Sequence, residues 1–276
     1  MGLDWTRATV LGLTEFEVSW ELLGLGETPP QLDPPSAGRT MEERRRIVAA
    51  VCADLRRRGL GDDRGPHPVL AERLRLLAGA ELTLDLRFRG DTLVAGLAAC
   101  HANRCTLVAG LAACHANRCT LAVRHGAQIA LLDVPVDAAA PALVELIGPV
   151  TPGPGAVVTL PAATLDAARS VAPDDPGRFA EELVWRGVPR LDAGRLVRMC
   201  SGVRQRGQFG ATGRPGGGRR RRAPYVVGMH RTDDGHFRQL RRTESGTTTV
   251  TIGPVTTQGL VDELADLAGA VSGSRI

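Results

Sequence analysis

Residues 81–89 read Glu-Leu-Thr-Leu-Asp-Leu-Arg-Phe-Arg and form the clearest strand pattern in the sequence. Leu82, Leu84, Leu86 and Phe88 alternate strictly with polar or charged neighbours. Successive side chains of a strand point to opposite faces, so this pattern predicts a strand with one buried and one solvated face. Such strands are typical of antiparallel sheets, one face of which can meet water. We therefore predict that the chain is built around an antiparallel sheet.

The segments on either side of this strand predict one order of elements twice. In the first half, helical patterns at 14–23, 41–58 and 68–78 precede the strand, and apolar segments up to 134 and a helix near 137–147 follow it. In the second half, helical material at 161–200 precedes strand candidates at 207–212, 223–231, 237–242 and 247–252, and a last helix covers about 260–271. The fold class is therefore α+β, with a central antiparallel sheet flanked by helical bundles in a quasi-two-fold arrangement. We expect a single domain over residues 1–276 with pseudo-repeat halves 1–150 and 151–276.

Two helix starts carry the same local signal. Thr14 with Glu17, and Thr40 with Glu43, have the spacing of a capping box, in which the two side chains satisfy the first backbone amides of a helix. We predict that both pairs begin helices.

The basic residues exclude several enzyme classes. All 34 are arginine, and against 30 acidic residues they give a formal charge of +4. A chain without lysine contains no P-loop lysine, Schiff-base lysine or Ser/Lys catalytic pair. No other catalytic arrangement or glycine-rich phosphate loop emerges from the motifs, so we predict a protein that is not an enzyme and uses no cofactor or small-molecule substrate.

The charge is concentrated in one region. Between Arg195 and Arg242 there are 13 arginines against Asp233 and Asp234, a local charge of 13 − 2 = +11, whereas the remainder carries 21 − 28 = −7. The run Arg219–Arg222 lies in this region. A nucleic-acid-binding protein is one interpretation, although no recognition motif accompanies the charge. A charged hairpin edge that blocks strand pairing is the other.

A tandem repeat follows the first strand. Residues 92–105 and 106–119 are identical at all 14 positions, which indicates a recent in-frame duplication or a sequence artefact inside one hairpin. Inserting a single strand into a meander would reverse the direction of every later strand. We therefore expect the surplus copy to form a protruding or irregular excursion with local disorder, not an ordered central strand.

The repeat also contains four of the six cysteines: Cys100, Cys105, Cys114 and Cys119. Zinc is the metal that such a set would suggest. The usual zinc spacing has two to four residues between paired ligands, most often two, and takes its second pair from elsewhere. Here both pairs have four intervening residues and one is only a copy of the other. We predict no metal site, with these four cysteines as the only candidates.

The ends of the chain and its hydropathy carry no membrane signal. The sequence begins with Met1-Gly2-Leu3-Asp4, an acid where a signal peptide has basic residues, and no apolar run is long enough to span a bilayer. We expect a cytoplasmic protein.

Several strings, in this order, make the chain resemble the EspG family of actinobacterial type VII (ESX) secretion-associated proteins. They are Leu22–Gly26 with Pro29-Pro30 and Leu32, Gly38–Thr40 with Glu42–Arg44, Arg58–Leu60, Leu76–Ala78 running into Leu82–Arg89, Leu121–Gly126, Gly207–Gly210, the arginine run, Thr232–Gly235 and 255–267. Each string is short and none is catalytic, so order and spacing carry the resemblance, which extends over nearly the whole chain.

The resemblance implies a cytosolic, non-enzymatic chaperone that binds helical secretion substrates, typically PE–PPE heterodimers or another helical ESX-type substrate, and keeps them soluble for export. For such a partner we predict contacts with the first-half hairpin and with the sheet positions Arg87, Arg89, Arg124 and His125. The nucleic-acid-binding alternative would instead use the Arg195–Arg242 region.

Overall fold

The structure is a computed structural model, and it describes residues 2–90, 93–101, 105–108, 111–114, 118–214 and 218–272. The helices are α1 (Leu13–Leu22), α2 (Met41–Arg57), α3 (Pro68–Gly79), α4 (Ala139–Glu145), α5 (Ala162–Val171), α6 (Pro176–Trp185), α7 (Arg190–Cys200) and α8 (Thr257–Ser272). The strands are β1 (Thr9–Gly12), β2 (Gly61–Asp62), β3 (Gly65–Pro66), β4 (Leu82–Arg89), β5 (Leu93–His101), β6 (Cys105–Val108), β7 (Leu111–Cys114), β8 (Arg118–His125), β9 (Gln128–Val134), β10 (Val158–Pro161), β11 (Gln205–Gly213), β12 (Arg221–Arg222), β13 (Val227–Thr232), β14 (Gly235–Glu244) and β15 (Thr247–Pro254). The predicted α+β class is confirmed.

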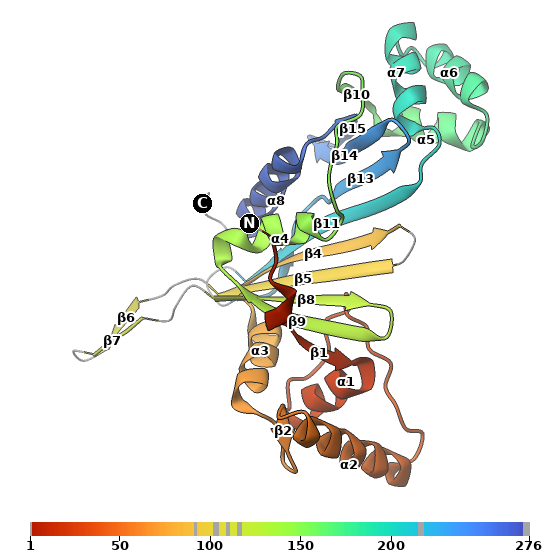
Figure 1. Cartoon of the computed structure of the whole chain (residues 1–276). Coiled ribbons are helices and arrows are strands. Elements are labelled where there is room, and N and C mark those ends of the chain that lie inside the picture. The colour runs from red at the N-terminus through yellow and green to blue at the C-terminus, as the bar shows by residue number, and fades with distance from the viewer. Residues whose placement is uncertain are drawn as a thin grey trace.

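One antiparallel sheet runs through the molecule (Figure 1). Its order is β1-β9-β8-β5-β4-β11-β13-β14-β15-β10, with β12 paired to β11. Each half begins with an edge strand, passes through helices, returns at the centre as β4 or β11, and then steps outward strand by strand to α4 or α8. The arrangement is therefore quasi-two-fold about the β4–β11 contact. On this basis we infer that residues 1–150 and 151–276 repeat one plan within a single domain.

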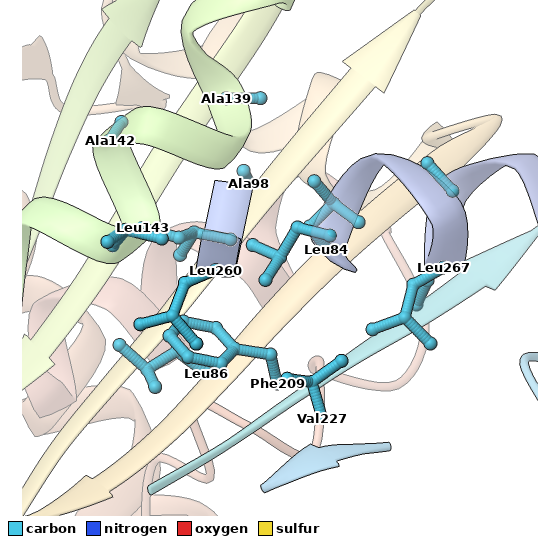
Figure 2. Packing of buried hydrophobic residues seen from close by; sticks show 14 of the residues in the cluster. Leu84, Leu86, Ala98, Ala139, Ala142, Leu143, Phe209, Val227, Leu260 and Leu267 are labelled. Atoms are coloured by element: carbon cyan, nitrogen blue, oxygen red, sulfur yellow. The ribbon is translucent and has the colours of Figure 1, made fainter. Parts of the chain in front are cut away.

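The first face of the sheet is covered at its centre. Leu86 of β4 lies directly opposite Phe209 of β11, and both are fully buried. Leu143 of α4 and Leu260 and Leu267 of α8 complete this core (Figure 2). The alternating pattern of residues 81–89 buries its apolar side chains here, as predicted.

The second face is covered only towards its two edges. Helices α1–α3 pack over β1, β9, β8 and part of β5, where Phe16, Leu74 and Leu97 belong to one apolar cluster. Helices α5–α7 pack over β10, β15 and β14, where Leu165 and Phe237 belong to another. The two bundles stand apart in Figure 1, and the ends of β4, β11 and β13 lie between them. Exposed polar residues of β4 and β11 line a groove on this face.

The duplicated segment leaves the sheet. Strands β6 and β7 pair only with each other among the described residues, and Figure 1 shows this hairpin extending away from one end of β5 and β8. The chain leaves after His101 and re-enters opposite it at Arg118, so the direction of later strands is unchanged. The prediction that the surplus copy lies outside the main sheet is confirmed. The prediction of local disorder falls on residues 102–104, 109–110 and 115–117, and these lie outside the described residues.

The two predicted capping boxes have different outcomes. Thr40 caps α2 and accepts a hydrogen bond from the Glu43 amide at 3.1 Å, as predicted. The prediction for α1 was wrong by two residues: Gly12, not Thr14, is its N-cap, and the Gly12 amide donates to Glu15 at 2.6 Å. Strand β1 leads directly into this helix, so the pairing of Gly12 with Gln128 of β9 fixes the start ahead of Thr14.

Candidate partner-binding groove

A groove of about 1260 Å³ occupies the uncovered middle of the second face. Its floor comes from β8, β5, β4, β11, β13 and β14, one wall from the segment after α1, and the other from α5 and the end of α7. The lining residues are Gln31, Asp33, Arg87, Phe88, Arg89, Leu93, Ala95, Arg124, His125, Gly126, Arg169, Pro173, Cys200, Val203, Arg206, Gly207, Gln208, Val226, Gly228, Met229, His230, Gln239 and Arg241. This is a broad surface for a macromolecular partner with both polar and apolar contacts.

All four predicted partner-binding residues line this one groove. Arg87 donates to the Pro30 carbonyl at 3.1 Å, and Arg124 donates to the Leu32 and Asp33 carbonyls at 2.6 Å each. These two arginines therefore hold the segment after α1 against the sheet. Arg89 and His125 are exposed on the groove floor near its end.

The second half of the sheet contributes groove residues that the sequence analysis did not single out. Arg206 and Gln208 alternate along β11 with Gln205, Gly207 and Phe209, and they point to the groove side. Arg169 and Arg241 extend the basic lining, and Arg241 pairs with Asp166 at 2.6 Å. The period-two pattern that located residues 81–89 is present in β11 as well, although its three glycines and one alanine weaken it.

Two histidines in the C-terminal half, His230 and His236, have structural roles. The Nε2 atom of His230 lies 2.7 Å from the Met199 carbonyl, and its ring stacks on Phe237. Burial lowers the pKa of His230 and also that of His236, which contacts the Thr151 backbone. Burial thus favours the neutral form of each imidazole. Asp233, which lies between them in sequence, is exposed and pairs with Arg204 at 2.8 Å.

The arginine run folds back on the same face of the sheet, at the end away from the groove. Arg222 makes a two-pronged ion pair with Asp85, whose carboxylate is buried. Arg220 donates to the Ala78 carbonyl at 3.0 Å, near the end of α3. Gly210 lies under the Arg222 guanidinium, where a Cβ atom would come within 2.0 Å of a guanidinium nitrogen. At least two of the four arginines therefore have partners within the chain.

The cysteine candidates do not form a metal centre in the described part of the chain, where no group of three or more metal-ligating side chains occurs. Cys100 and Cys119 lie directly opposite each other on β5 and β8, with their sulfur atoms 3.1 Å apart. The hydrogen bond with Cys100 and burial raise the pKa of the Cys119 thiol, which disfavours the thiolate that a metal requires. Cys105 and Cys114 pair in the separate β6–β7 ladder.

Comparison with known proteins agrees with this architecture. The model of the EspG family matches residues 13–266, so the chain belongs to the EspG family. Among solved structures, the chain is similar to the Mycobacterium tuberculosis type VII secretion system chaperone EspG5, in a complex with a PE25–PPE41 dimer. The TM-score is 0.75 at 14% identity, over 97% of this chain and 98% of the other. No curated protein matches by sequence. Among the described residues, no helix has the length and apolar character needed to cross a membrane.

Proposed function

We propose that this protein is a non-enzymatic cytoplasmic chaperone that binds a helical type VII secretion substrate in the groove. The client is a PE–PPE-like pair or another helical ESX-type substrate, and binding keeps it soluble for export. The single observation that carries the proposal is the groove itself, an uncovered stretch of sheet between two helical bundles in a member of the EspG family.

The groove has the features expected for the tip of a helical hairpin. Exposed Leu93 offers an apolar contact, and the surrounding arginines provide hydrogen-bond donors. Recognition of a helical partner in a groove depends on this combination of an apolar anchor and polar rim contacts. No covalent chemistry is needed for such a role.

The proposal is tested by co-expressing the chain with the helical-hairpin gene pairs that neighbour its own gene. We expect one pair to co-purify and to elute with the chain as a single complex whose mass, from light scattering, equals the sum of the subunits. The same clients expressed alone are the control, and we expect them to aggregate. Failure to co-purify with every neighbouring pair would contradict the proposal.

Nucleic-acid binding through Arg195–Arg242 stays the alternative prediction. It is tested by retention on heparin and DNA, which should fall steeply with salt. Replacement of Arg219–Arg222 by alanine should abolish such retention if this region binds phosphates.

A further inference from the structure

Two arginines of the groove floor meet across the central pair of strands. In the register of β4 and β11, Arg89 lies directly opposite Arg206. Both are exposed and both line the groove. Side chains at directly opposed positions have Cβ atoms about 4.5–5.5 Å apart, and like charges there are unfavourable. The fold places two positive charges together on the floor of the groove.

Nothing in the described part of the chain neutralises this pair, since neither Arg89 nor Arg206 forms an ion pair there. The neighbouring arginines differ. Arg204 has Asp233, and Arg87 has the Pro30 carbonyl. The groove lining as a whole has six arginines and one aspartate, a formal balance of 6 − 1 = +5. An anionic group from outside the chain would therefore bind most favourably between Arg89 and Arg206.

The surroundings of the pair favour a protein carboxylate over a nucleic-acid phosphate. Leu93 lies directly opposite Arg89 on β5 and is 58% exposed, so an apolar contact adjoins the charge. Among the described lining residues, Phe88 is the one phenylalanine, tyrosine or tryptophan, and it is buried. Nucleic-acid channels combine basic residues with exposed aromatic rings on which bases stack. This groove instead combines basic residues with an aliphatic side chain.

We propose that Arg89 and Arg206 form a carboxylate-binding pair that selects clients whose docking segment carries an aspartate or glutamate beside an apolar residue. This inference rests on the proposed function and specifies the chemistry of its partner. A guanidinium binds a carboxylate through two parallel hydrogen bonds, so two adjacent guanidinium groups can hold one or two acidic side chains in a defined orientation. The client carboxylate would also relieve the repulsion between the two arginines.

The test measures the affinity of the co-purifying client pair for the wild-type chain and for Arg89→Ala, Arg206→Ala and the double Arg89→Glu/Arg206→Glu variant. Arg45→Glu is the matched control, because Arg45 is exposed on α2 and outside the groove lining. We expect each alanine variant to weaken binding about tenfold and the double reversal to weaken it by at least about 100-fold, because like charges brought together at an interface are strongly unfavourable. Arg45→Glu should change affinity less than about twofold, since it lies away from the contact.

A second arm identifies the acidic residue. Changing single aspartates or glutamates of the client to arginine should restore binding to Arg89→Glu/Arg206→Glu at one position. If every groove variant binds the client as tightly as the wild-type chain does, the carboxylate-binding pair is overturned and the proposed function still stands. A wild-type chain that binds no client would overturn both. Loss of DNA retention in the double reversal, with client binding unchanged, would assign the pair to phosphate and overturn the inference.

Discussion

The two ends of the open face of β4 and β11 use arginine in different ways. At one end, Arg222 pairs with buried Asp85 and stabilises the fold. At the other end, Arg89 and Arg206 face each other without an ion pair among the described residues. The count of arginines in the sequence is thus a poor guide to where a partner binds. The informative quantity is whether each guanidinium already has a partner within the chain.

The largest effect on stability is expected at the Asp85 end. Arg222→Ala leaves a buried carboxylate without its cation, whereas Asp85→Ala leaves a half-exposed guanidinium that water can solvate. We expect Arg222→Ala to lower the free energy of unfolding by about 2–4 kcal/mol and Asp85→Ala by about 1–2 kcal/mol. Urea denaturation measures both, and equal losses would show that burial of Asp85 does not control the pair.

Gly210→Ala provides a control for this assignment. The added Cβ would displace the Arg222 guanidinium, so the substitution should destabilise the wild-type chain. In the Arg222→Ala background the same change should cost close to nothing, because the atoms it displaces are absent. Additive losses would contradict the contact.

An intermediate effect is expected from removing one copy of the repeat. Deletion of residues 105–118 joins Arg104 to Cys119 and shortens the connection between the His101 and Arg118 positions from 16 residues to two. Cys100 still pairs with Cys119 in the remaining hairpin. A shorter loop costs less entropy on closure, so we expect an unfolding free energy about 1 kcal/mol higher.

The same deletion also tests which end of strands β5 and β8 binds the client. The excursion leaves the sheet at the His101–Arg118 end, and the groove lies at the Arg89–His125 end of the same strands. Client affinity should therefore be unchanged. If the deletion variant folds but no longer binds the client, the client binds at the excursion, and the assignment of the groove as the binding site is wrong.

The smallest effect on stability is expected for the groove arginines. Arg89→Ala or Arg206→Ala removes one of two opposed like charges, so the free energy of unfolding should stay within about 0.5 kcal/mol of wild type, with any change towards greater stability. Thermal and urea unfolding measure this. A large destabilisation would show that these residues have a structural role like that of Arg222.

The strand pattern of residues 81–89 was sufficient to predict the sheet, because alternation depends only on local sequence. The partner of each arginine was not predictable in this way. Asp85 and Arg222 are far apart in sequence, and the pairing of β11 with both β4 and β12 brings them together. Arg206 was missed as a groove residue for the same reason: its place opposite Arg89 is set by pairing between the two halves.

The repeat shows this limit within one sequence. Val94 and Leu97 lie in the uninterrupted strand β5, whereas their identical copies Val108 and Leu111 face each other across the β6–β7 ladder. The local residues are the same in both places. Strand β5 has β4 and β8 as neighbours, whereas β6 and β7 have only each other within the described ranges. Long-range pairing therefore decides which structure the same residues adopt.

The position of this excursion also makes the sheet a practical scaffold. The chain departs and returns at directly opposed residues, so additional length at this point leaves the register of every strand intact. A fluorescent label, an affinity tag or a small folded module inserted here would report on complexes formed in the groove while remaining remote from it. The duplicated segment is itself an insertion at this point, and the strand pairing of the main sheet accommodates it.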